Sequence, residues 1–142
     1  MLRSEAEVAV NDLLAALREV ADVYADDAEA VDEPALKSLF GELGRRHQVL
    51  CDRLRQVIPQ LGDLPREPDA DKETLHRLGN RLKALLSGDE RQVYLDERAD
   101  AEQVLARQAA DALRHDLPPP VHAVLDAIRQ EAQAAMDRLR QR

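Results

Sequence analysis

The stretch LFGELGRRHQVLCDRL, residues 39–54, places one histidine on a helix face that is otherwise apolar. Residues on this face recur in alternating steps of three and four, which is the spacing of one packed face of an α-helix. They are Leu36, Phe40, Leu43, His47, Leu50 and Leu54. The pattern predicts a long helix, packed against other helices, whose buried face contains His47.

The composition favours an all-α protein with a single domain over residues 1–142. A chain of 142 residues is long enough to bury one core. Ala, Leu, Arg, Glu, Asp and Gln dominate, glycine occurs only five times, and aromatic residues make up 2%. This composition is typical of helical proteins, and strand-forming residues gather into no alternating run.

The formal net charge of −8 argues against nucleic acid and against anionic membrane surfaces as partners, because both select basic proteins. No apolar run approaches the ~20 residues that a membrane-spanning helix needs. The start of the chain, MLRSEAEVAV, lacks the apolar core and cleavage pattern of a signal peptide. A single cysteine cannot form an internal disulfide. We therefore expect a cytoplasmic location.

Capping residues and prolines mark the first two helices. Ser4 and Glu7 form a capping box at the start of the first helix. Pro34 belongs in the first turn of the second helix, where the missing amide costs nothing, and this helix runs to about Ile58. Because almost no loop separates the two helices, we expect them to pack antiparallel.

Two more long helices are expected in the second half of the chain. One begins within SGDE (87–90), and the other follows DLPPP (116–120). The last helix carries the apolar stripe Val121, Leu125, Ile128, Ala132, Ala135 and Leu139. The stripe expected on the helix before it is Val93, Tyr94, Ala101, Val104, Leu105, Ala109, Ala112 and Leu113. Glu97 falls on this second stripe, between Tyr94 and Ala101.

Residues 59–88 form the long connection between the second and third long helices. The segment PQLGDLPREPDAD (59–71) is rich in proline and interrupts the helical pattern. Asp71 can then cap a short helix that carries Leu75, Leu78, Leu82, Leu85 and Leu86. A pair of tight hairpins joined by one long helical crossover is the connection pattern of a ferritin-like four-helix bundle.

Short segments distributed over nearly the whole chain carry a family resemblance. They are NDLL (11–14), VDEPALKSLF (31–40), LHRLGNRLKALLSGDE (75–90), DERADAE (96–102), LPPPVHAVL (117–125) and AMDRLR (135–140). In these segments the chain resembles a group of small bacterial ferritin-like proteins classed as a domain of unknown function. The resemblance implies a four-helix bundle with a helical crossover and supplies no established reaction, because none of the segments is a catalytic signature.

A carboxylate-bridged di-metal site in such a bundle needs one inward Glu from each of two helices and Glu-x-x-His from each of the other two. Here Gly44 stands three residues before His47, where the Glu would be. In the last helix, Gln133 and Met136 stand where Glu and His are wanted. The remaining histidines, His76, His115 and His122, lie in the crossover or beside the triple proline. We therefore predict no metal or cofactor site and no catalytic residue.

The alternative is an altered iron or manganese site that uses His47, Glu97 and Asp26. Without a metal, a buried imidazole still needs a hydrogen-bond partner, and Glu97 or a similar carboxylate can supply it. Cys51 lies one helical turn after His47, so a Cys–His nucleophile is conceivable. An inert core cysteine is the preferred interpretation. A haem bound by His47 and Met136 is a more remote alternative, since Met136 also suits a core position.

The preferred interpretation is a non-enzymatic ferritin-like bundle that acts as a scaffold or interaction module. By analogy with other small ferritin-like proteins, we expect this role to belong to stress physiology. The alternative function is a di-metal carboxylate protein or oxidase with an altered ligand set. The five leucines of residues 75–86 exceed what one thin stripe needs, which makes a homodimer a further expectation.

Overall fold

The computed structural model describes residues 4–62 and 88–141. Its elements are α1 (Glu5–Ala30), α2 (Pro34–Val57), the 3-10 helix η1 (Ile58–Leu61), α4 (Gly88–Ala112) and α5 (Pro119–Arg140). Helix accounts for 89% of these residues, and none of them lies in a strand. The predicted all-α class is therefore confirmed. No helix within the described residues is both long and apolar enough to cross a membrane.

The predicted starts of the first two helices are confirmed. Ser4 caps α1, and its side chain accepts a hydrogen bond from the Glu7 amide at 3.1 Å. Pro34 occupies the first turn of α2. α2 ends at Val57, and the chain continues as η1 through Leu61.

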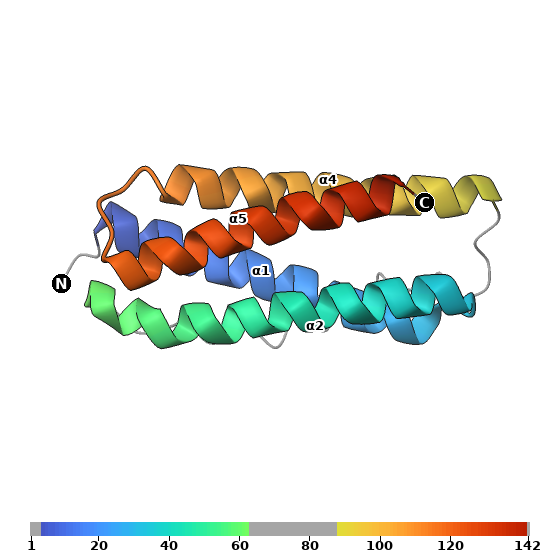
Figure 1. Ribbon diagram of the computed structural model, residues 1–142, viewed down its shortest axis with the longest axis horizontal. Helices are drawn as coiled ribbons and strands as arrows, with labels where there is room; N and C mark the ends of the chain where they lie inside the picture. Colours follow the sequence, from blue (N-terminus) through green and yellow to red (C-terminus); the bar gives the residue numbers. More distant parts are fainter. Residues whose placement is uncertain (1–3, 63–87, 142) are drawn as a thin grey trace.

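The four long helices in the described residues pack side by side as two antiparallel hairpins (Figure 1). α1 pairs with α2, and α4 pairs with α5. The hairpins meet mainly through α1 against α4 and α2 against α5. α2 and α4 run in the same direction, and α1 and α5 run in the opposite one (Figure 1). The predicted Asp71 cap, the leucines of residues 75–86 and His76 lie outside the described residues.

The core divides into two clusters along the bundle axis. One cluster is almost entirely aliphatic and lies towards the turn between α4 and α5; it includes Leu13, Leu17, Leu54, Leu125 and Ile128. The other lies towards the turn between α1 and α2; it includes Tyr24, Phe40, Leu43, Tyr94 and Leu139. We call them the aliphatic half and the aromatic half. The apolar stripe predicted for the last helix is buried throughout.

The predicted inward face of α4 is right only in part. Tyr94, Leu105, Ala109 and Ala112 are buried as predicted, but the two valines are not. Val93 and Val104 are 56% and 61% exposed, and Glu97 is also exposed. The face that points into the bundle follows alternating steps of four and three residues: Leu95, Ala99, Glu102, Ala106 and Ala109. Burying the two valines would have turned this face, with Leu95 and several small alanines that permit close packing, out to water. The bundle buries the alanine face and leaves the valines in solvent.

Candidate functional site

A hydrogen-bonded cluster of polar side chains lies inside the bundle where three helices meet. Tyr24 comes from α1, His47 from α2 and Glu102 from α4. Each residue sits on the inward face of its helix because its neighbours one turn away are apolar core residues. Their exposures are 1%, 0% and 0%, so the cluster is shielded from water.

Glu102 is the centre of the cluster. The Tyr24 hydroxyl donates a hydrogen bond to Oε2 of Glu102. Nε2 of His47 lies 2.9 Å from both carboxyl oxygens. On the other side of the imidazole ring, Nδ1 lies 2.7 Å from the Leu43 carbonyl oxygen. Each polar atom of this cluster therefore has a protein partner, as burial requires.

The Leu43 carbonyl fixes one proton of the imidazole. A carbonyl can only accept, so Nδ1 carries a proton and donates it. Nε2 faces the Glu102 carboxyl, and one further proton lies between these two groups. The pair is either an imidazolium beside a carboxylate or a neutral imidazole beside a carboxylic acid.

Burial and the neighbouring groups act on the pKa of His47 in opposite directions. Burial lowers the pKa, whereas the hydrogen bond and charge of Glu102 and the Leu43 carbonyl raise it, and the net pKa is raised. This direction favours the imidazolium form. Burial and the adjacent Glu102 carboxylate both raise the pKa of the Tyr24 phenol. Tyr24 therefore stays protonated and remains a donor.

Aromatic packing and one glycine hold Tyr24 in place. Its ring lies edge-on to the His47 ring at 5.3 Å between centroids and stacks with Phe40 at 6.1 Å. Gly44 of α2 lies directly against Tyr24, since a Cβ atom at position 44 would come within 3.3 Å of the Tyr24 Cβ. The missing side chain at Gly44 lets α1 approach α2 closely at this level.

A second buried pair lies next to this cluster, towards the start of α4. The Tyr94 hydroxyl donates a hydrogen bond to Oδ1 of Asp27, and the Arg98 guanidinium lies 5.3 Å from the Tyr94 ring centroid. Oδ2 of Asp27 has no hydrogen-bond partner among the described residues. Burial raises the pKa of Asp27 to about 6, although the Tyr94 hydrogen bond and the Arg98 charge oppose the shift.

Comparison with known families gives one result. The profile described as Domain of unknown function (DUF2383) matches residues 5–115. The chain belongs to this family. The match spans α1, α2 and α4 and therefore includes both buried clusters, whereas α5 lies beyond it. Neither the curated proteins nor the solved structures contain a match.

The structure separates the three residues of the altered metal site that we considered for this DUF2383 chain. His47 is buried and hydrogen-bonded to a carboxyl group as predicted, but the partner is Glu102 and not Glu97. Glu97 is exposed on the outside of α4, and Asp26 is half-buried on α1. Within residues 4–62 and 88–141, no group of three or more His, Cys, Asp or Glu side chains is arranged to hold a metal ion.

The Cys51 thiol has the properties of a core residue. It is buried in the aliphatic half, and burial raises its pKa to about 12. A thiol in this environment stays protonated at neutral pH, which makes it a poor nucleophile. The two ring nitrogens of His47 are engaged by the Leu43 carbonyl and the Glu102 carboxyl group, which leaves neither of them to activate the thiol.

Sequence reasoning missed Glu102 and the hydroxyl contact of Tyr24. A signal for Glu102 existed, because Leu95, Ala99, Glu102, Ala106 and Ala109 repeat in steps of four and three. The signal was weak because most of these residues are alanine. No local signal pairs Tyr24 with Glu102, since 78 positions separate them.

Proposed function

We propose that this chain is a non-enzymatic helical bundle of ferritin-like architecture that acts as a scaffold or interaction module. One observation carries the proposal. At the centre of the bundle, Tyr24, His47 and Glu102 satisfy one another, and the outer nitrogen of His47 is taken by a backbone carbonyl. These three side chains therefore link α1, α2 and α4 by hydrogen bonds to one another.

The arrangement of the helices supports the ferritin-like part of the proposal. α2 and α4 run parallel and belong to different hairpins, so the end of η1 and the start of α4 lie at opposite ends of the bundle (Figure 1). This is the connectivity of bundles with one long crossover. The inward Glu102 of α4 and the inward His47 of α2 also occupy mid-helix positions of the kind that such bundles use for metal ligands.

The neighbours of His47 and Glu102 favour a structural role. Gly44 stands one turn before His47, where a metal-binding bundle has a glutamate, and Tyr24 fills the adjoining space. Tyr24 then binds Glu102 through its hydroxyl. A substrate would have to displace a buried aromatic ring in order to reach the carboxyl group, and this favours a scaffold over an enzyme.

An altered iron or manganese site is the second candidate. It is favoured by the burial of His47 and Glu102 beside each other and by Glu131 of α5, whose negative charge contributes to the raised pKa of His47. Glu131 is at present paired with Arg46, with 2.7 Å between Arg46 Nε and Glu131 Oε1. A metal ion would have to take Glu131 from Arg46 and Glu102 from Tyr24.

Thermal melts with and without Fe²⁺, Mn²⁺ and Zn²⁺ distinguish the two candidates. A metal bound at one hundred times its Kd adds about 2.7 kcal/mol to the free energy of unfolding, which a melt detects easily. We expect no metal-dependent rise in Tm for the wild-type chain. A rise that is lost in His47→Leu/Glu102→Leu but kept in the surface control Glu42→Gln would overturn the scaffold proposal.

A further inference from the structure

The two long sides of the bundle carry opposite charge. α1 and α4 form one side and together hold fifteen acidic and four basic residues, a net charge of −11. α2 and α5 form the other side and hold five acidic and eight basic residues, a net charge of +3. The protein is therefore acidic overall, but the positive charge of its α2/α5 side attracts acidic groups.

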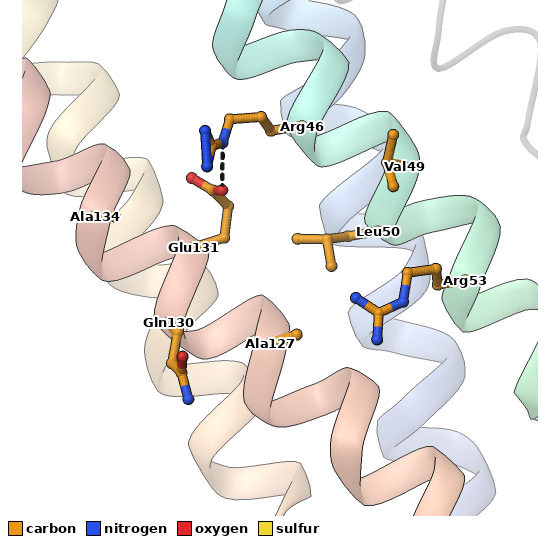
Figure 2. Close-up of a pocket in the computed structure, with 8 residues that line it drawn as sticks. All are labelled: Arg46, Val49, Leu50, Arg53, Ala127, Gln130, Glu131 and Ala134. Carbon is orange, nitrogen blue, oxygen red and sulfur yellow. Dashed lines mark hydrogen bonds and ion pairs between the residues drawn. The ribbon is translucent and has the colours of Figure 1, made fainter.

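The basic side contains a groove along the seam between α2 and α5 (Figure 2). Its lining residues are Arg46, Val49, Leu50 and Arg53 of α2, and Ala127, Gln130, Glu131 and Ala134 of α5. The ion pair between Arg46 and Glu131 spans the two helices at one end of the groove, and Arg53 lies at the other end (Figure 2). Between them the alanines of α5 leave the seam shallow and largely apolar.

Arg53 and Val49 are the two groups in the groove that still lack a partner. Arg53 makes no ion pair or hydrogen bond with any residue in the described part of the chain. Val49, one turn before it, is 57% exposed. An unpaired guanidinium beside an exposed aliphatic side chain fits a carboxylate and an apolar residue that are also one helical turn apart.

The outer face of α4 presents such a pair. Asp100 and Val104 are one turn apart and both exposed, and Val104 is the most exposed of the large apolar side chains described. The Asp100 side chain is 74% exposed, and its ion pair with Arg140 is long, at 3.9 Å, so the carboxylate is open to a second partner. Val93 and Glu97 continue the same face towards the start of the helix. Val93, Glu97 and Val104, which the sequence pattern placed on the inward face, therefore form an exposed strip together with Asp100.

We propose that the α2/α5 groove of one copy of this chain docks the outer face of α4 of a second copy. In this contact Val49 packs against Val104, and Arg53 pairs with Asp100. The contact must be intermolecular, because α4 packs with α1 on one side of the bundle, whereas the groove lies between α2 and α5 on the other. Pairing two grooves with each other would instead bring the arginines of one copy against those of the other, which like-charge repulsion opposes.

The proposal goes beyond the scaffold function and does not depend on the buried cluster. Its surface residues can be changed without touching Tyr24, His47 or Glu102, so failure of either idea leaves the other standing. The contact is small and partly electrostatic, and its strength should fall as salt shortens the screening length from ~10 Å at 0.1 M to ~3 Å at 1 M.

Sedimentation velocity over a range of protein concentrations tests the contact. At low ionic strength the average mass should rise above that of one chain with concentration, and 1 M NaCl should reverse the rise. Arg53→Glu and Asp100→Lys should each weaken self-association at least about tenfold. The double variant Arg53→Glu/Asp100→Lys restores opposite charges and should recover most of the association.

Arg114→Glu is the matched control. It makes the same charge change as Arg53→Glu at an exposed position in the turn between α4 and α5, away from both surfaces, and should leave self-association unchanged. Circular dichroism verifies that each variant keeps its helix content. A wild-type chain that stays monomeric at every concentration and low salt would overturn the proposal. Single variants that associate as the wild type does, or a double variant that fails to recover, would do so equally.

Discussion

The aliphatic half and the aromatic half of the core hold the same four helices together by different means. In the aliphatic half, Leu, Ile, Val and Ala side chains fill the space, and the side-chain amide of the buried Asn11 donates a hydrogen bond to the Glu7 carbonyl of its own helix. In the aromatic half and at its border, every buried polar side chain binds a group on another helix. The first half depends on volume, which many sequences can supply, whereas the second depends on specific partners.

The difference predicts how each half responds to change. Apolar contacts are non-directional, so an altered side chain in the aliphatic half costs in proportion to the volume and area lost. Removing one member of a buried hydrogen-bonded set costs more, because the remaining members stay buried without a partner. Removing the whole set at once can cost little.

The largest effect is expected for Glu102→Leu. The change leaves Nε2 of His47 and the Tyr24 hydroxyl buried without their acceptor, and the free energy of unfolding should fall by about 3–5 kcal/mol. Urea unfolding followed by circular dichroism measures this. Tyr24→Phe/His47→Leu/Glu102→Leu replaces all three polar groups by apolar ones of similar size, and should recover most of the loss. A triple variant as unstable as Glu102→Leu would show that the cluster does not act as a unit.

The same comparison changes the expectation for His47→Leu. From the sequence, an apolar replacement of a lone core histidine should be neutral or stabilising, because it removes a desolvation cost. In the structure the replacement leaves Glu102 fully buried with Tyr24 as its remaining partner. We therefore expect His47→Leu to destabilise the fold and His47→Leu/Glu102→Leu to be milder than either single change.

Matched leucine truncations compare packing in the two halves. Leu43 lies in the aromatic half and Leu125 in the aliphatic half, and both are fully buried. Each change to alanine should cost about 2–5 kcal/mol. Leu43→Ala should be the more costly, because rings and hydrogen-bonded groups around it cannot collapse into the cavity as freely as aliphatic side chains. Equal costs in urea unfolding would show that the aromatic half is no stiffer than the aliphatic half.

The sequence predicted the aliphatic half well and the aromatic half only in part. The inward faces of α1, α2 and α5 follow from strongly periodic Leu, Ile and Val, and Ser4 and Pro34 identify helix starts by local chemistry. α4 carries few large apolar residues on its inward face. Because Val93 and Val104 are large and apolar, the prediction placed them inside, and the predicted face therefore missed Glu102. The network itself depends on how far α1, α2 and α4 are shifted along the bundle axis, which no local pattern encodes.

The aromatic half should also make stability depend on pH. The pKa of Asp27 is about 6 in the folded chain against an ordinary value of 3.8, so the folded state binds this proton more tightly than the unfolded state. The free energy of unfolding should therefore rise as pH falls from about 7 towards 4, by up to about 3 kcal/mol from this group. Thermal melts between pH 4 and pH 8 measure the slope.

Asp27→Asn is the matched control for that slope. Asparagine keeps an acceptor for the Tyr94 hydroxyl but cannot ionise, so the part of the pH dependence between about 6 and 4 should disappear. The contribution of His47 remains in this variant. Its raised pKa stabilises the fold at low pH, and this stabilisation is lost as pH rises through the folded-state pKa. An unchanged slope in Asp27→Asn would assign the effect to other groups.

The smallest expected effect concerns how closely α1 and α2 approach in the aromatic half. Alanine is favoured over glycine inside a helix by about 1 kcal/mol. At Gly41 a new Cβ would meet only the end of the flexible Arg45 side chain at 3.3 Å, so Gly41→Ala should gain most of this amount. At Gly44 the Cβ would lie 3.3 Å from the Cβ of Tyr24, next to the α1 backbone, and Tyr24 cannot move without straining its hydrogen bond to Glu102. Gly44→Ala should therefore be neutral or slightly destabilising.

Urea unfolding of both variants tests this difference. Equal gains in the free energy of unfolding would show that α1 can shift away from α2 at no cost to the cluster, and that Gly44 is not needed to position Tyr24.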